Sequence, residues 1–206
     1  MTDTAARTQG IRIVQGIPAG QLDEAARVLV DAFEQKVVHE LRPSSPEQAH
    51  RIIAASLDPG LGWVALGDDG SVLGIAGVGM RGHHFSRMGY RLLAGEFGAL
   101  GAVPRWLGAL FEGLVARPRT GQWRVEVLAV AAAARGTGIG TALLEAVIDA
   151  ARENGMRSVG LEVVDVNDRA LQLYERLGFR SVGNVPTGWL TAGGGYRAVR
   201  FMRLDQ

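Results

Sequence analysis

The residues with the clearest chemical potential form a glycine-rich turn, Arg135-Gly136-Thr137-Gly138-Ile139-Gly140. Three glycines at alternate positions leave a row of backbone N–H groups without Cβ atoms in front of them. The turn follows an apolar run over 123–130 and precedes apolar residues at helical spacing from Thr141 onward. Backbone N–H groups at the start of a helix, supported by the helix dipole, bind phosphate or pyrophosphate. The turn therefore predicts a phosphate site made by the main chain.

The positions of the glycines argue against two common nucleotide sites. No Lys follows them, as the P-loop requires, and Thr141 stands where the dinucleotide fingerprint needs its third Gly or Ala. A generic nucleotide-binding α/β protein is therefore disfavoured. The alternative is a tight strand-to-helix turn that binds nothing, although three alternating glycines exceed what such a turn needs.

Two segments carry a family resemblance. The pattern R-G-x-G-x-G after Leu-Ala-Val resembles the acyl-CoA-binding signature of the GNAT superfamily of N-acetyltransferases, with matches at Arg135, Gly138 and Gly140. The segment LEVVDVNDRALQLYERLGF, residues 161–179, resembles a strand-loop-helix of the same superfamily. The resemblance implies that an acetyl group passes directly from acetyl-CoA to a primary amine of a small molecule or peptide, in a ternary complex. The alternatives are a non-catalytic acyl-CoA-binding module and a transferase of the same fold that uses a longer acyl chain.

The resemblance also implies where acetyl-CoA binds. Backbone amides of the turn, more than the Arg135 side chain, are expected to hold the pyrophosphate, and an N–H near residues 128–130 is expected to stabilise the oxyanion. Asn167 is expected to contact the pantetheine arm, to cap the helix that begins near Asp168, or both. The full set of expected acetyl-CoA contacts is Leu128, Ala129, Val130, Arg135, Gly136, Thr137, Gly138, Ile139, Gly140, Thr141, Asn167, Ala170 and Tyr174.

An acceptor amine with a pKa of about 10.4 must lose a proton before it attacks. The resemblance gives Tyr174 as the acid that assists the departing thiolate; the alternative is an aromatic that packs the helix on the sheet. The candidates for the base are Glu162, which agrees better with the family motif, and Glu126 on the central strand. Both glutamates have a structural alternative as ion-pair partners of Arg124 or Arg157.

The period of two along a strand predicts that Glu126 shares a face with Leu128 and Val130. His83 and His84 follow a glycine-containing strand, and we expect them to be exposed loop residues first and substrate contacts second. The chain has four His and no Cys, and no spacing typical of a metal site, so no metal is expected.

Composition limits the remaining classes of function and location. The 206 residues are 47% hydrophobic and 21% charged with a net charge of +1, which gives no field that would select nucleic acid or an anionic membrane. The N-terminus lacks the apolar core of a signal peptide. We expect one domain over 1–206, disorder over 1–10, and a cytoplasmic protein.

Periodicity predicts alternating strands and helices, and the resemblance implies an α/β fold: a mixed, largely antiparallel sheet of six or seven strands flanked by helices, with parallel pairing at the centre. A helical insertion over 86–118 precedes the central strand, with two amphipathic helices separated near Pro104. It is expected to form a lid or a wall of the acceptor pocket, or else a homodimer surface or an extra core layer. The strands are expected at 11–14, 63–66, 72–78, 123–130, 158–163, 180–185 and 197–204, and the other helices at 21–33, 46–57, 141–151 and 169–177.

Overall fold

The computed structural model describes residues 7–8, 10–115, 118–187 and 195–206, and it describes no side chains over 111–115. Most of the N-terminal segment that we expected to be disordered lies outside these ranges. Two of its residues form a short strand, β1 (Arg7–Thr8), which pairs with β2 (Ile11–Gln15).

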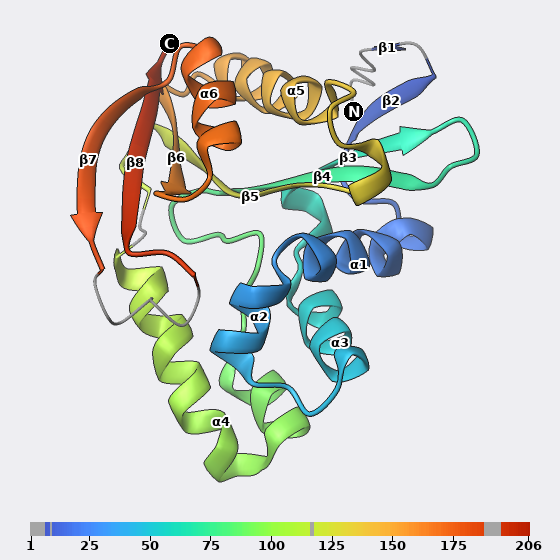
Figure 1. Ribbon diagram of the computed structural model, residues 1–206, viewed down its shortest axis with the longest axis vertical. Coiled ribbons are helices and arrows are strands. Elements are labelled where there is room, and N and C mark those ends of the chain that lie inside the picture. Colours follow the sequence, from blue (N-terminus) through green and yellow to red (C-terminus); the bar gives the residue numbers. More distant parts are fainter. Residues whose placement is uncertain (1–6, 9, 116–117, 188–194) are drawn as a thin grey trace.

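A mixed sheet forms the centre of the molecule, with its strands in the order β1-β2-β3-β4-β5-β6-β8-β7 (Figure 1). All neighbouring strands are antiparallel except β5 and β6, which are parallel. Without the two-residue β1, seven strands make up the sheet, which confirms the predicted fold class. The further strands are β3 (Gly62–Gly67), β4 (Val72–Gly79), β5 (Gln122–Val130), β6 (Ser158–Val164), β7 (Arg180–Pro186) and β8 (Ala198–Asp205).

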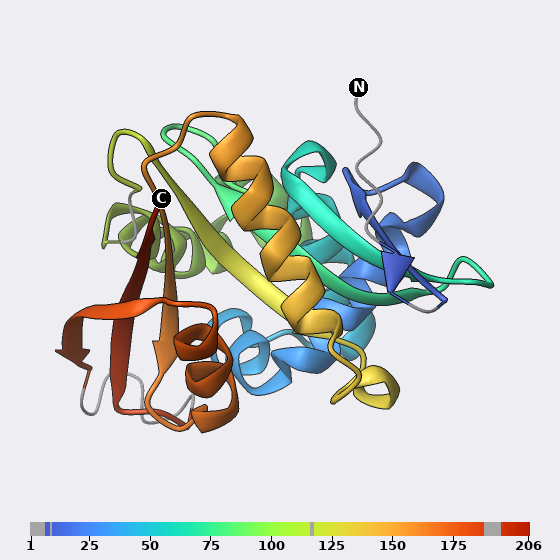
Figure 2. The same cartoon turned by 90° about the horizontal axis from the view of Figure 1, so that it is seen from above.

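Helices cover both faces of the sheet (Figures 1 and 2). On one face lie α5 (Ile139–Glu153) and α6 (Asp168–Arg176). The other face carries α1 (Leu22–Ala32), α2 (Glu34–Leu41), α3 (Pro46–Ser56) and α4 (Tyr90–Val115).

Each face has its own hydrophobic core, because side chains of a strand point alternately to opposite sides. The core on the α5 side joins α5 and α6 to β5, β6 and β8, and includes Val125, Leu143, Leu161, Tyr174 and Met202. The core on the α1 side joins the N-terminal helices to β3 and β4, and includes Ala25, Ile52, Val64, Ile75 and Phe85.

The insertion forms α4, but its break differs from the prediction. The helix is interrupted at Gly98, with φ 72° and ψ 165°, whereas Pro104 lies inside the second helical segment. Gly98 adopts a positive φ that residues with a Cβ avoid, so the glycine rather than the proline sets the break. Leu93 and Ala102 are fully buried in the core on the α1 side, so part of the insertion is an extra core layer, while Leu100 is 89% exposed.

Candidate functional site

The glycine turn ends in an uncapped helix. Gly138 is the N-cap of α5 with φ 89°, Gly136 has φ 88°, and no side chain caps the first turn. The first turn of α5 also lacks an acidic residue. The first N–H groups of a helix have no acceptor within the helix, so this end presents donors and the positive end of a dipole. The turn thus has the geometry of an anion site.

Two side chains of the turn donate hydrogen bonds to carbonyl groups of the chain just before it. Thr137 Oγ1 donates to the carbonyl of Ala134 at 2.7 Å, and Arg135 Nε donates to the carbonyl of Val130 at 3.2 Å. Arg135 therefore joins the turn to the end of β5. That the main chain, rather than Arg135, supplies most of the anion contacts stays a prediction.

The two central parallel strands separate halfway along their length. Their pairing runs from Gln122 opposite Ser158 to Val125 opposite Leu161 and then stops, although β5 continues to Val130. The edge of β5 that faces β6 therefore has no strand partner beyond Val125 within these two strands, both of which are fully described. Unpaired backbone groups at a strand edge can pair with an added chain or ligand. After β5 the chain passes through the short 3-10 helix Ala132–Ala134 into the glycine turn (Figure 1).

A β-bulge sits where the separation begins. On β4, Gly77 pairs with Val127 and the next residue, Val78, pairs with Val125, so Glu126 is the extra residue on β5. A bulge re-aims side chains, and bulges are frequent next to active sites. The prediction that Glu126 shares a face with Leu128 and Val130 is therefore wrong.

The face that Glu126 occupies follows from its contacts. Leu128 and Val130 pack against the core on the α5 side, whereas Glu126 contacts residues beside the other core. Its Oε2 accepts a hydrogen bond from the N–H of Phe85 at 2.9 Å, and its Oε1 lies 2.7 Å from His84 Nδ1. A Cβ at Gly79 would approach Glu126 Oε1 to 2.1 Å, so the glycine leaves the room that this carboxylate occupies.

His84 is the residue that sequence analysis undervalued. His83 is exposed as expected, but the side chain of His84 is only 27% exposed and is held by Glu126, whose own side chain is 13% exposed. The two residues are 42 positions apart. Only the position of His84 at the exit of a glycine-containing strand hinted at a function, and nothing in the sequence connected it with Glu126.

Glu162 is held differently. Its Oε1 forms an ion pair with Arg124 at 2.9 Å, which is one of the structural alternatives considered for this residue. Glu162 follows Leu161, the last residue of β6 that pairs with β5, just as Glu126 follows Val125 on β5. The structure thus brings both candidate bases to the point where the strands separate, one with a histidine and the other with an arginine.

Tyr174 lies inside the core on the α5 side. It is 7% exposed, and its ring centroid is 6.0 Å from that of Phe179. Burial raises the pKa of the Tyr174 hydroxyl from 10.0 to about 12. The packing alternative is therefore confirmed for the ring, and the hydroxyl stays protonated and able to donate at neutral pH.

Asn167 caps α6 as one of its two predicted roles requires. Its side-chain oxygen accepts a hydrogen bond from the N–H of Ala170 at 3.1 Å. Because this bond uses the N–H of Ala170, a ligand could meet Ala170 only through its methyl group or carbonyl.

Within the described residues, no group of three or more His, Asp or Glu side chains could hold a metal ion. The helices in the same part of the chain include none with the length and hydropathy needed to cross a membrane.

Curated relatives resemble about a quarter of this sequence. The mycothiol acetyltransferase of Parafrankia sp. (strain EAN1pec) is 50% identical over 56 residues, which are 27% of this chain and 17% of that protein. The chain spans 17–31% of the length of the curated relatives that it matches.

Solved structures align over almost the whole chain. A GCN5-related N-acetyltransferase from Kribbella flavida aligns with a TM-score of 0.60 at 23% identity, covering 96% of this chain and 99% of that one. A chain of the NatC complex, solved with Gag peptide and CoA, aligns with a TM-score of 0.59 at 16% identity, covering 96% and 99%. These likenesses show the fold. The model of the acetyltransferase (GNAT) family matches residues 24–179, which is well over half of the sequence, and the chain therefore belongs to the GNAT family of acetyltransferases.

Proposed function

We propose that the protein transfers the acetyl group of acetyl-CoA to a primary amine of a small molecule or peptide, by direct attack within a ternary complex. One observation carries the proposal: the unpaired edge of β5 beyond Val125 is followed, after the short 3-10 helix Ala132–Ala134 and the glycine turn, by the uncapped N-terminus of α5. An extended chain with amide groups and a terminal pyrophosphate matches both parts. Such a ligand would replace β6 as the partner of β5 and would end at the helix dipole.

For the cofactor arm, we propose contacts along the open edge and the turn. The main chain of Leu128, Ala129 and Val130 would pair with the pantetheine amides, as a neighbouring strand would. The N–H groups of residues 136–141 would hold the pyrophosphate. Asn167 and Ala170, at the start of α6, would border the arm from the other side of the opening.

For the base, we propose Glu126 rather than Glu162. A proton taken by Glu162 would disrupt its ion pair with Arg124, whereas Glu126 has His84 beside it to share the proton. His84 is partly exposed and offers a route from the buried carboxylate to solvent.

The chemical step balances with these groups. The amine nitrogen forms a C–N bond with the acetyl carbon, its proton passes to Glu126, the C–S bond breaks, and the electron pair leaves with the sulfur. A backbone N–H near Leu128 would stabilise the oxyanion.

For the leaving group, we propose that Tyr174 donates a hydrogen bond to the sulfur. Its pKa of about 12 lies above the roughly 8.5 of a thiol, so full proton transfer to the thiolate would run uphill. Hydrogen-bond donation stabilises the developing negative charge without that cost. The role is therefore that of a donor held neutral by burial.

The proposal is tested by thiol release. The chain has no Cys, so a thiol reagent reports free CoA without a background from the protein. Incubation with acetyl-CoA and a panel of primary amines should release CoA only when an accepted amine is present, and mass spectrometry should find the amine heavier by one acetyl group. Binding of acetyl-CoA without turnover of any amine would favour the binding-module alternative. A preference for a longer acyl-CoA would favour the alternative of a transferase with the same fold that uses a longer acyl chain.

A further inference from the structure

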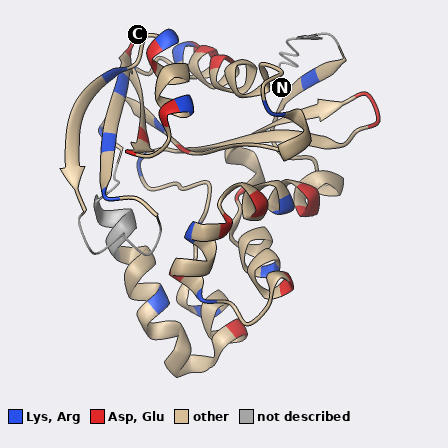
Figure 3. Ribbon diagram, in the orientation of Figure 1, with Lys and Arg blue, Asp and Glu red and all other residues tan. Residues whose placement is uncertain are grey.

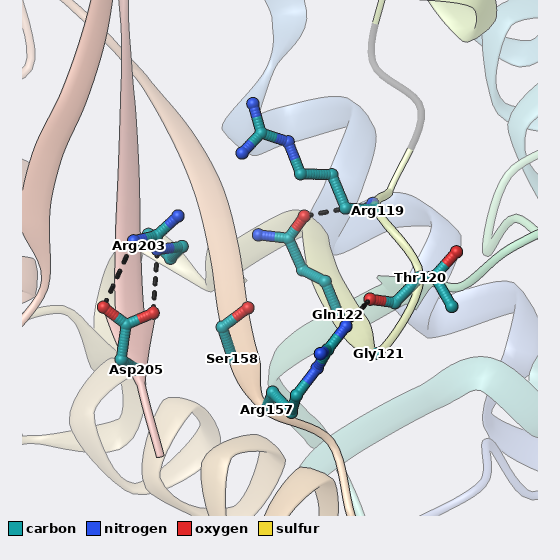
Figure 4. Close-up of a pocket in the computed structure, with 8 residues that line it drawn as sticks. All are labelled: Arg119, Thr120, Gly121, Gln122, Arg157, Ser158, Arg203 and Asp205. Carbon is teal, nitrogen blue, oxygen red and sulfur yellow. Dashed lines mark hydrogen bonds and ion pairs between the residues drawn. The ribbon is translucent and has the colours of Figure 1, made fainter.

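A polar cleft lies beside the proposed acceptor site and has no role in the account above. Two neighbouring cavities of about 290 and 250 Å³ share Arg119, Gln122 and Arg203 in their walls. The larger one also includes Glu162, and thus touches the point where β5 and β6 separate. The smaller one continues toward the start of the two strands (Figure 4).

The floor of this cleft is a glycine between two arginines. Arg124 on β5 pairs with Gly160 on β6, and Gly160 pairs with Arg203 on β8, so the three residues form one row across the sheet. Their sequence neighbours Val125, Leu161 and Met202 lie in the core on the α5 side. The row therefore faces the other side, where Glu126 also lies.

Gly160 leaves a hollow in this row. Neighbouring strands are about 4.8 Å apart, so the backbones of Arg124 and Arg203 are separated by about 10 Å with no side chain between them. The carboxamide of Gln122 leans over the hollow: its Nε2 would be 2.7 Å from a Cβ at Gly160. The carboxamide thus occupies part of the hollow, Arg124 and Arg203 flank it on the neighbouring strands, and the larger cavity lies against all four residues.

The cleft concentrates positive charge in a chain whose net charge is only +1. Four arginines line the two cavities against two carboxylates, Glu162 and Asp205. Figure 3 shows arginines in blue along β8, the strand that carries Arg203. The lining arginines are Arg119, Arg124, Arg157 and Arg203.

Two of these arginines, Arg203 and Arg119, have guanidinium N–H groups that could bind a ligand. Arg203 is held in an ion pair with Asp205: its buried Nε lies 2.8 Å from Oδ1 and its Nη2 donates to Oδ2 at 3.3 Å, so only its remaining guanidinium N–H groups can reach a ligand. Within the same part of the chain, no residue forms an ion pair with the Arg119 guanidinium, which is exposed. Guanidinium groups bind carboxylates through paired, charge-assisted hydrogen bonds.

We infer that the acceptor amine carries a carboxylate, which binds over Gly160 between Arg203, Arg119 and Gln122. The inference rests on the proposed function, since it places the amine of the same molecule at the opening between the strands. Glu162 is two residues from Gly160 on the same face, a backbone distance of about 7 Å. The substrate class is thus a small amino acid or ω-amino acid rather than a polyamine.

The test compares matched acceptors that differ in one charge. We would measure kcat/KM for 4-aminobutyrate, phenylalanine and lysine, each against its own carboxamide. Amidation keeps the size and lowers the amine pKa, so at neutral pH it favours the carboxamide and works against the expected result. At least one carboxylate should exceed its carboxamide by about tenfold or more, the effect of one charged hydrogen bond.

Arginine variants test whether the cleft causes the preference for the carboxylate over the carboxamide. Arg203→Gln and Arg119→Gln should each remove most of the preference by raising KM for the carboxylate more than for the carboxamide, with CoA affinity unchanged. The matched control is Arg152→Gln, which removes the same charge from an exposed ion pair on α5, on the other face of the sheet. Equal loss for both members of a pair would contradict the inference.

Failure of the inference and failure of the proposed function give different results. Turnover of carboxamides or polyamines with no carboxylate preference would overturn the inference and leave the transferase function intact. With no turnover of any amine, calorimetric titration of the three amino acids into the CoA-bound protein still tests the cleft. Binding that Arg203→Gln weakens would support it, and absence of binding would overturn it.

Discussion

The parallel strands β5 and β6 have a closed half and an open half, and the two halves differ in chemistry as well as in pairing. In the closed half, residues 122–125 pair with 158–161, and arginines and Gln122 surround Gly160. The open half begins at a bulged glutamate, has an unpaired edge and ends at a bare helix N-terminus. One pair of strands thus provides charged side chains at one end and backbone donors at the other. Between them lie the two glutamates.

The largest expected effect is on kcat, and it distinguishes the role of Glu126 from that of Glu162. Glu126→Gln keeps the size of the side chain but removes the proposed base, and should lower kcat by about 100-fold or more with little change in the affinity for acetyl-CoA. Glu162→Gln should lower kcat by less than about tenfold, because it removes an ion pair rather than the base. Steady-state kinetics on one acceptor checks both. If Glu162→Gln lowered kcat more than Glu126→Gln, the base would be Glu162 on β6 and not Glu126.

The second-largest expected effect is on CoA binding, and it tests the glycine turn at the end of the open half. Gly138→Ala places a Cβ at a positive φ and in front of the helix amides, and should weaken CoA binding by about tenfold or more. Gly155→Ala is its control at the other end of α5, because Gly155 also has a positive φ and open space around its Cα. Both variants should lose about 1 kcal/mol of stability. Only the first should lose affinity in a calorimetric titration, and equal affinities would mean that the turn is structural.

Tyr174 gives a pH-dependent effect. Its pKa is about 12 in the folded protein and about 10 when unfolded, so the folded state keeps this proton longer. The stability that this contributes is complete below pH 10 and is lost as the pH rises toward 12, by about 2 to 3 kcal/mol. Denaturant unfolding at pH 9 and 11 should show about half of this loss in the wild type, beyond the loss in Tyr174→Phe. Equal losses in the two proteins would contradict the buried, neutral hydroxyl. In kinetics, Tyr174→Phe should lower kcat by about tenfold.

Arg135 should give the smallest effect. Its guanidinium bonds to the carbonyl of Val130, at the junction of the open strand and the turn. Arg135→Ala should weaken CoA binding only about two- to fivefold, since an exposed cation near a phosphate contributes about 1 kcal/mol or less. Titration at low and high salt should show the difference shrinking with salt. A loss as large as that of Gly138→Ala would mean that the side chain, and not the main chain, holds the pyrophosphate.

Most of the architecture follows from patterns within a few residues of each other. Ser45 caps α3 through the N–H of Gln48 as its position before Pro46 predicts, and the glycines at 136 and 138 adopt the positive φ that they alone permit. These features depend on local chemistry, which a single sequence contains. The same holds for the alternation of strands and helices, whose periods differ.

The features of the site that could not be predicted depend on pairing between distant strands. The side of the sheet that Glu126 faces depends on a bulge that exists only against β4. Its contact with His84 crosses 42 residues, and the row of Arg124, Gly160 and Arg203 requires the register of three strands. The break at Gly98 was missed for a different reason: Pro104 is the stronger breaker by local propensity, but the chain turns where a positive φ is needed.

The central claim is that acetyl-CoA binds along the open half of β5 and ends at the glycine turn. Backbone amide hydrogen exchange, with and without saturating acetyl-CoA, tests it residue by residue. The account predicts new protection over 127–130 and 136–141, and none over 122–125, where β6 already pairs with β5. Protection elsewhere in the chain, or no change at a concentration that calorimetry shows to be saturating, would contradict it.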